Sequence, residues 1–459
     1  MDKETLLNVL SSGDAEQFQA LAEGYHYVDL AELYEALDED QKLEFTRLVG
    51  PIIFARILSD LPEKQMEEAI ESFGKDDQLE LLSNVEDDDL ADILQTVSED
   101  AKAQYMDQLD PEARKTMKAL LQYGEETAGG RMTTHYGKVH RDMSIAEAIK
   151  SLRDIEEETQ SLGRIFVVDD NGVLIGKLRL RHLAFSERTT KIAEVMEPVT
   201  HQILASADQE EAIQMFFKYD MYNLPVVNEH DHLLGVITHD DAMDIFEQES
   251  TEDMEKMAGV SSGQSDGSYL NTGVFEHFKR RFPWLVILAI LAISSGFVML
   301  KYDELLKGAF ILALYLPMIV SAGGNTGGQA ATMVIRAMAL GELDKESSWR
   351  VAWKEVRLGL CLGSLLGLIM GALTFVIIPS LPSSLSSLPE GVTVFKFALT
   401  TAISLAAQIT TSTLSGAVLP LMARKFNIDP AVIASPAITT VVDVSGLVIY
   451  FSVATFILF

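Results

Sequence analysis

The chain has 459 residues and a formal net charge of −32, distributed very unevenly. Residues 1–270 contain 58 acidic and 23 basic side chains, whereas residues 271–459 contain 10 and 13. This balance argues against a nucleic-acid partner and favours cations, and the single cysteine, Cys361, excludes an intrachain disulfide and fits a reducing compartment. The N-terminus has no apolar core of the signal-peptide type. We therefore expect an acidic cytosolic part joined to a nearly neutral membrane part.

Residues 1–130 show short amphipathic helices separated by acidic residues, proline or glycine. Apolar side chains recur every three or four positions in segments such as DLAELYEAL and PEKQMEEAIESFG. Helices this short cannot bury a face alone, so the pattern predicts a solenoid-like stack whose hand stays open. The glycine-rich stretch TAGGRMTTHYGKV that follows is interpreted as a hinge.

Residues 131–192 and 193–250 repeat one order of elements: helix, strand, turn, strand, helix. The strands are RIFVVDD and VLIGKLRL in the first unit, and LPVVNE and LLGVIT in the second. Such an internal duplication indicates two copies of one α/β unit. It resembles a tandem pair of CBS domains, which form a sensor module.

CBS pairs often bind adenine nucleotides through a hydroxyl residue and an Asp three positions later. Thr238 and Asp241 in GVITHDD match this arrangement, whereas the first unit, with Leu180 and Arg181, offers no such Asp. The resemblance therefore implies one site for ATP or another adenine nucleotide, or else an empty, structural cleft.

Residues 251–275 begin as a charged helix and continue into a Ser/Gly-rich linker, so they are interpreted as a connecting, plug-like helix. The membrane part, 276–459, contains five runs long enough to span a bilayer: about 283–300, 308–336, 356–378, 394–423 and 430–458. Basic residues cluster before the first run, between the second and third, and between the fourth and fifth. By the positive-inside rule this predicts a multi-pass protein of the cell membrane with a cytosolic N-terminus and a C-terminus outside.

Two of these runs carry polar or small residues that a plain membrane anchor does not need. The second contains Pro317 and the segment GGNTGGQ, which could loosen the helix and free carbonyls beside Asn325, or could serve close helix packing. The fourth has polar residues at helical spacing (Ser404, Gln408, Thr411 and Ser415), which favours hydrogen bonds between helices over a pore.

The last run contains an acidic residue, Asp443, in PAITTVVDVSG. An Asp at the centre of a spanning helix costs about 2.5–3.5 kcal/mol on insertion scales. It shares a small, polar face with Thr439 and Gly446. An ion pathway explains this face better than the alternative, a packing face in which Asp443 is hydrogen-bonded to another helix.

The full set of features resembles the MgtE family of magnesium channels and transporters, and GGNTGGQ together with the intramembrane Asp is specific. The resemblance implies a homodimer in the bilayer with a pore on the two-fold axis, lined by Asp443, Asn325 and backbone oxygens near Gly324 and Thr439. It also implies that cytosolic Mg²⁺ closes the pore by bridging acidic surfaces. The residues carried over for this role are Asp88, Asp92, Asp220, Asp241, Asp244, Asp253 and Asp429.

Other functions fit the sequence less well. An intramembrane metalloprotease would need a His-Glu-x-x-His type of site, and the membrane runs contain no histidine, so we expect no enzyme. The alternative is a transporter of broader divalent specificity, including Co²⁺ and Mn²⁺, regulated by the CBS pair. The absence of His, Cys or Met ligand sets in the membrane runs favours a hard ion such as Mg²⁺.

Overall fold

The structure is a computed structural model that describes residues 3–154, 161–261, 269, 272–343, 347–380, 388–389, 391–426, 428–433 and 435–459. It divides into two compact units, of which one reaches to Glu247 and the other begins at Gln248. The boundary falls inside one helix, α15 (His239–Ala258), so the expected connecting helix continues the last helix of the CBS pair. The linker that follows it lies mostly outside the described residues.

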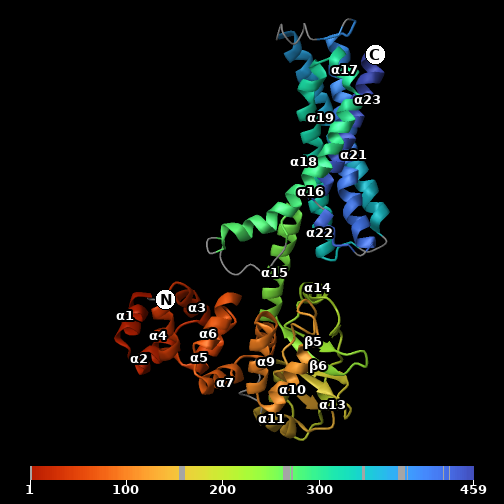
Figure 1. Cartoon of the computed structure of the whole chain (residues 1–459). Helices are drawn as coiled ribbons and strands as arrows, with labels where there is room; N and C mark the ends of the chain where they lie inside the picture. The colour runs from red at the N-terminus through yellow and green to blue at the C-terminus, as the bar shows by residue number, and fades with distance from the viewer. Residues whose placement is uncertain are drawn as a thin grey trace. The chain divides into compact units, whose positions relative to one another are not determined.

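The first unit begins with a stack of short helices, as predicted (Figure 1). They are α1 (Lys3–Ser12), α2 (Ala15–Ala22), α3 (Tyr27–Glu35), α4 (Glu39–Val49), α5 (Pro51–Leu58), α6 (Glu63–Glu71), α7 (Lys75–Ser83), α8 (Asp87–Thr96), α9 (Glu99–Gln108) and α10 (Pro111–Leu120). Each helix buries its apolar stripe in a common core, where the rings of Phe18, Phe45 and Phe54 meet edge to face.

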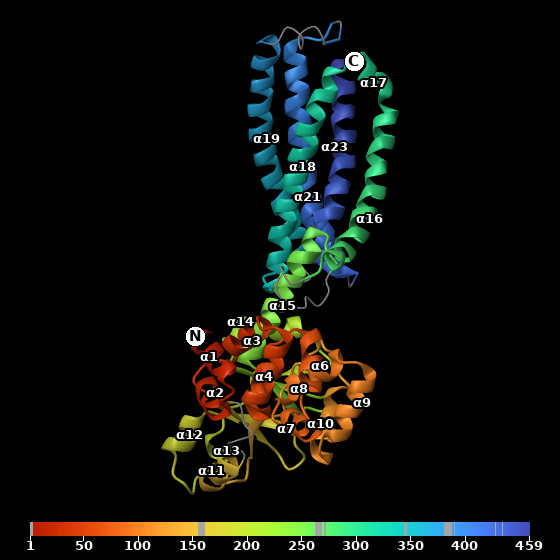
Figure 2. The ribbon, with the colours of Figure 1, turned by 60° about the vertical axis from the view of Figure 1, so that its left-hand side comes forward.

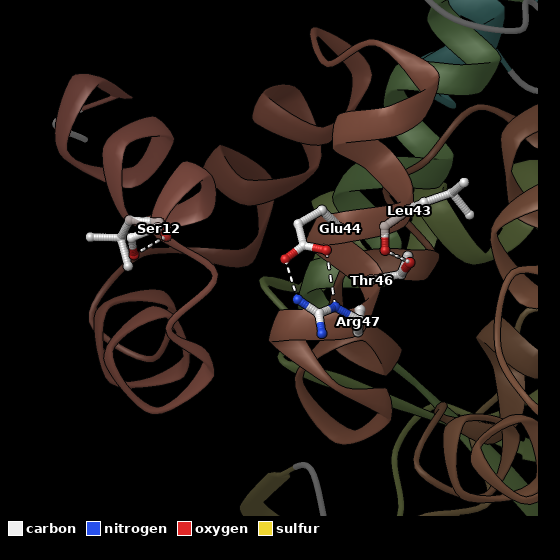
Figure 3. A network of polar contacts seen from close by, with 6 residues as sticks. Ser12, Leu43, Glu44, Thr46 and Arg47 are labelled. Atoms are coloured by element: carbon white, nitrogen blue, oxygen red, sulfur yellow. Dashed lines mark hydrogen bonds and ion pairs between the residues drawn. The ribbon is translucent and has the colours of Figure 1, made fainter.

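Helix α4 shows how such a short helix is stabilised locally. It begins with a capping box between Asp38 and Gln41. Its outer face carries an ion pair between Glu44 and Arg47, one turn apart, with Arg47 Nε 2.9 Å from Glu44 Oε2 (Figure 3). Thr46, near the same end, is turned inward and donates to the Leu43 carbonyl at 3.0 Å.

The CBS pair contains two three-stranded sheets of the same topology. The first has strands β1 (Tyr136–His140), β2 (Ser161–Val168) and β3 (Leu174–Leu178), and the second has β4 (Ile203–Leu204), β5 (Asn223–Val227) and β6 (Leu233–Thr238). In each sheet the first pair is parallel and the second antiparallel, and both hairpins carry a register shift at the same place. The predicted duplication is therefore confirmed. The accompanying helices are α11 (Ile145–Asp154), α12 (Leu180–Phe185), α13 (Ile192–Val195), α14 (Gln209–Tyr219) and α15.

The glycine-rich stretch before β1 is a packed segment in this structure, and its interpretation as a hinge stays a prediction. Ala128 and Gly129 donate backbone hydrogen bonds to the carbonyls of Ala207 and Ala205, at 2.8 and 2.9 Å. A Cβ on Gly130 would collide with the carbonyl of Gly124. The glycines allow close approach of the backbone, and the first helices share one core with the second CBS domain.

The second unit contains five long helices that run side by side in both views (Figures 1 and 2). They are α16 (Val274–Lys301), α18 (Ile311–Ala339), α19 (Ser348–Ser380), α21 (Val394–Lys425) and α23 (Ser435–Leu458); the short α17 (Asp303–Gly308) and α22 (Pro430–Ile433) lie between them in sequence. Among the described residues, four helices are long and apolar enough to cross a membrane, namely Val274–Lys301, Ser348–Ser380, Val394–Lys425 and Ala437–Leu458.

The helix at the predicted second span, α18, contains GGNTGGQ and is not among these four. It is continuous through this segment, so the expectation that Pro317 and the glycines loosen it was wrong. Gly323 and Gly327 are buried in packing, and a Cβ on Gly416 of α21 would collide with the carbonyl of Gly327. The alternative of close helix packing therefore describes these two glycines.

Candidate functional site

The residues proposed for a pore lie on one polar face of the second unit. Asn325 and Thr439 are exposed, and Gly324 and Asp443 are half-buried. A Cβ placed on Gly324 would lie 4.0 Å from Thr439 Cγ2, so the GGN segment of α18 lies beside α23. Thr439 and Asp443 are one helical turn apart. The structure therefore brings Gly324 next to Thr439, with Asn325 and Asp443 close to them in sequence, and the pore role of the four residues stays a prediction.

Asp443 supports the interpretation as an ion pathway over that as a packing face. Within the part of the chain that the structure describes, its carboxylate has no hydrogen bond or ion pair with a neighbouring helix. Since α23 is apolar enough to span a bilayer, a carboxylate without a protein partner requires water or a cation.

A cluster of carboxylates in the first unit joins α8 to the first turn of α15. Asp88 is only 7% exposed, and its Oδ1 has no hydrogen-bond partner among the described residues. Burial raises the pKa of Asp88 well above its usual value, and the charge of Asp241 raises it further. Burial also raises the pKa of Asp241, against the opposing hydrogen bond from the Thr238 hydroxyl.

The neighbouring acids belong to the same cluster. Burial and Glu86 raise the pKa of Asp89 to about 7. Asp92 forms a 2.7 Å ion pair with Arg131, yet burial still raises its pKa to about 6. Ionised carboxylates at these positions repel one another, and Arg131 offsets only part of this repulsion.

Two of the acidic residues that the resemblance implies as Mg²⁺ ligands, Asp220 and Asp244, are exposed, unlike Asp88. Asp220 is exposed and ends α14 in a left-handed conformation, with φ of 48°. Asp244 is exposed on α15; partial burial and then the charge of Asp240 raise its pKa. Burial raises the pKa of Asp60, and the charge of Asp244 raises it further. Sequence reasoning missed Asp60, Glu86, Asp89 and Asp240, although the runs EDDD and HDD were a visible signal.

In the second unit, the end of α15 is linked by charges to the segment before α23. Lys256 Nζ lies 2.6 Å from Asp429 Oδ2 and 2.7 Å from Glu252 Oε1. Burial raises the pKa of Asp253, and so does the charge of Asp429. Arg280 of α16 pairs with Glu255 of α15. The structure therefore brings Asp253 and Asp429 together, with an ammonium group bound to Asp429.

A cleft of about 400 Å³ lies between the two CBS domains. Its lining residues come from both of them: Arg164, Arg179, Tyr222, Asn223, Thr238, His239 and Asp240. Arg164 Nη1 and Arg179 Nε are buried atoms that have no hydrogen-bond partner in the described residues, although Arg179 Nη2 also forms a 3.7 Å ion pair with Glu197. The two guanidinium groups give the cleft positive charge that suits an anion. Of the two predicted nucleotide ligands, Thr238 lines this cleft, whereas the Asp241 carboxylate accepts hydrogen bonds from Thr238.

Fold and sites define a multidomain membrane protein with a CBS sensor pair. Family models match residues 316–453 as a divalent cation transporter, 25–126 as an MgtE intracellular N domain, and 128–186 and 192–247 as CBS domains. The magnesium transporter MgtE of Thermus thermophilus is 33% identical over 99% of this chain and 98% of its own length. The chain therefore belongs to the MgtE family, as the sequence predicted.

Further relatives agree with this assignment. The magnesium transporter MgtE of Bacillus subtilis is 26% identical over 98% of this chain and 96% of its own length. A solved cytosolic domain of the Mg²⁺ channel MgtE in complex with ATP is 32% identical, with a TM-score of 0.51 over 53% of this chain and 99% of that one. These relatives are transporters, in line with the expectation that the chain is not an enzyme.

Proposed function

We propose that the chain is a Mg²⁺-selective channel for Mg²⁺ uptake that cytosolic Mg²⁺ closes. The observation that carries the proposal is the polar face formed by Asn325, Thr439 and Asp443, of which Thr439 and Asp443 lie on a helix apolar enough to span a membrane. Hydrocarbon cannot solvate such a face, whereas a water-filled passage can. The inside-negative potential then drives uptake with about 4.6 kcal/mol per divalent ion per 100 mV.

A homodimer would complete this passage. Two copies related by a two-fold axis can turn the same face toward each other and place two Asp443 carboxylates opposite the ion. Mg²⁺ prefers oxygen ligands and sheds its water reluctantly, so a wide ring of acceptors with negative charge suits a hydrated ion. In this arrangement the N-terminus is cytosolic and the C-terminus is outside.

Uptake into proteoliposomes under an inside-negative potential tests this proposal. We expect Mg²⁺ uptake by the wild-type chain and its loss in Asp443→Ala, with an unchanged dimer as the control for folding. Undiminished uptake by Asp443→Ala would remove the pore assignment. Because the family model describes a divalent cation transporter, Co²⁺ and Mn²⁺ are assayed in parallel; equal uptake of all three would favour the broader specificity.

Gating rests on the carboxylate clusters. When Mg²⁺ is scarce, the buried acids of α8 and α15 repel one another, and bound Mg²⁺ would remove that repulsion. Among the described residues no group of three or more His, Cys, Asp or Glu side chains is arranged to hold a metal ion, which favours weak binding of hydrated ions. A weak site at three times its dissociation constant contributes only about 0.8 kcal/mol. Six or seven such sites would give the ~5.5 kcal/mol that a complete switch requires.

The gate can be tested separately from the pore. Replacing all three of Asp88, Asp92 and Asp241 by Asn should leave Mg²⁺ current flowing at millimolar cytosolic Mg²⁺, because the carboxylates through which Mg²⁺ would bridge α8 and α15 are gone. The exposed Asp142, replaced by Asn, is the control. A triple variant that Mg²⁺ closes as it closes the wild type would contradict this gating model.

The cleft between the CBS domains is proposed to bind an adenine nucleotide. Arg164 and Arg179 would hold the phosphates, Tyr222 would stack on the base, and Thr238 and Asp241 would position the ribose. Calorimetry with ATP should show binding that weakens at least tenfold in Arg164→Gln/Arg179→Gln, since two charge-assisted hydrogen bonds are lost. Arg141→Gln, an exposed arginine of the same domain, is the control. Unchanged ATP binding in the double variant would indicate another site.

A further inference from the structure

A glutamine is buried between three helices of the second unit, α18, α21 and α23. Gln408 of α21 is fully buried, and its Nε2 donates a 2.9 Å hydrogen bond to the Val442 carbonyl of α23. Val442 directly precedes Asp443, and the same carbonyl accepts a 3.1 Å hydrogen bond from Ser445 Oγ. The backbone that carries the pore carboxylate is therefore held by side chains on two sides.

The neighbouring glycines leave room for the Gln408 amide because they have no Cβ. A Cβ on Gly323 of α18 would collide with Gln408 Nε2, and one on Gly446 of α23 would lie 2.7 Å from it. Gly323 directly precedes Gly324 and Asn325. The side chain of Gln408 thus fills the space between the GGN segment and the Asp443 turn, the two linings of the proposed pore.

The arrangement has an energetic cost that packing alone does not explain. Gln408 Oε1 accepts no hydrogen bond within the described residues, and a buried, unpaired amide oxygen costs about 1–3 kcal/mol. An apolar side chain of the same size would fill the space without this cost. The retained amide is therefore better explained by the one bond that it makes, to the carbonyl next to Asp443.

We propose that Gln408 is a positioning residue that fixes the spacing between Asn325 and Asp443, and thereby the discrimination between Mg²⁺ and larger divalent ions. The inference rests on the proposed pore. Mg²⁺ and Ca²⁺ carry the same charge, but Mg²⁺ keeps its water shell in strict octahedral geometry, whereas Ca²⁺ exchanges water readily and takes about six to eight oxygens in irregular geometry. A lining of fixed spacing can therefore discriminate between them, whereas a lining free to relax accepts both. Gln408 does not itself contact the ion.

The test measures the ratio of Mg²⁺ to Ca²⁺ uptake by the full-length chain in proteoliposomes. Gln408→Met keeps the volume and removes the hydrogen bond, so the ratio should fall about three- to tenfold, which corresponds to one net hydrogen bond. Gln408→Asn keeps an amide but is too short to reach Val442, and it should lower the ratio as well. Ser404→Ala, one turn away on the same buried face, should leave the ratio unchanged.

Using a ratio separates this role from a structural one, because partial misfolding lowers both uptakes together. If wild-type chain takes up Mg²⁺ and both Gln408 variants keep its Mg²⁺/Ca²⁺ ratio, the positioning role is wrong while the channel stands. If the wild-type chain takes up no Mg²⁺, the proposed function itself fails.

Discussion

The ammonium group of Lys256 and the carboxylate of Asp429 lie 2.6 Å apart, joining the end of α15 to the segment that precedes α23. Burial alone would lower the pKa of Lys256, but hydrogen bonds to Asp429 and Glu252 raise it, so the side chain stays charged. We propose Asp253 as a Mg²⁺ ligand together with Asp429. Burial raises the pKa of Asp253, and the nearby charge of Asp429 raises it further. Lys256 is therefore bound to Asp429, one of the two carboxylates that would coordinate Mg²⁺.

The first prediction concerns this competition. Lys256→Gln removes the competing cation, so Mg²⁺ should close the channel at a severalfold lower cytosolic concentration. Current recorded against cytosolic Mg²⁺ measures the shift, with the exposed Lys425→Gln as the control. A shift to higher Mg²⁺ would contradict the prediction and show that the ion pair itself holds the closed state.

The second prediction concerns pH. The folded chain keeps protons on Asp89 and Asp92 up to about pH 7 and 6, whereas the unfolded chain releases them near pH 4. The folded state therefore binds more protons between about pH 4 and 7, and stability falls as the pH rises through this window. In chelator, the melting temperature of the isolated first unit should be higher at pH 5.5 than at pH 7.5. Asp89→Asn should reduce this difference, and a melting temperature that rises with pH would refute the account.

The third prediction concerns the ion pair between Arg131 and Asp92. Arg131→Met leaves a half-buried carboxylate without its cation, which should lower the free energy of unfolding of the first unit by about 1–3 kcal/mol in chelator. Mg²⁺ should then restore more stability than in the wild type, because the cluster is more negative. Arg141→Met, which breaks an exposed pair, should cost less than about 0.5 kcal/mol. Equal costs in denaturant titrations would argue against the cluster.

The fourth prediction tests the dimer axis. In a Cys361→Ser background, Thr439→Cys should form covalent dimers with a short thiol-specific cross-linker in the membrane, because its two copies face one passage. Leu368→Cys, which is 70% exposed on α19, should not. Cross-linking at Leu368 but not at Thr439 would place the interface elsewhere.

The pattern of apolar residues predicted most of the fold, because the type and length of each helix or strand depend on neighbouring residues in the sequence. The CBS duplication and the long helices appear at their expected residues, since period and length determine them. The state of the GGNTGGQ helix was not predictable in this way. Whether a glycine loosens a helix or admits a neighbour depends on what packs against it, and Gly416 of α21 packs against Gly327.

The candidate sites show the same division. Asp443 is conspicuous in sequence because a charge in an apolar run has few explanations. Gln408 was interpreted as an interhelical hydrogen-bonding residue, which its bond to Val442 confirms. Its position beside Asp443 follows only from the tertiary structure. Asp89 and Glu86 belong to the acidic cluster because the packing of α8 places them near Asp241. The sequence alone does not distinguish a buried acidic residue from a solvated one.

Single-channel recording from membranes with Mg²⁺ as the sole permeant cation tests the central claim most directly. The account predicts a unitary Mg²⁺ current from the wild-type chain that stops when cytosolic Mg²⁺ is raised to millimolar levels, and no current from Asp443→Asn. A wild-type current that persists at millimolar cytosolic Mg²⁺, or an equal current from Asp443→Asn, would contradict it.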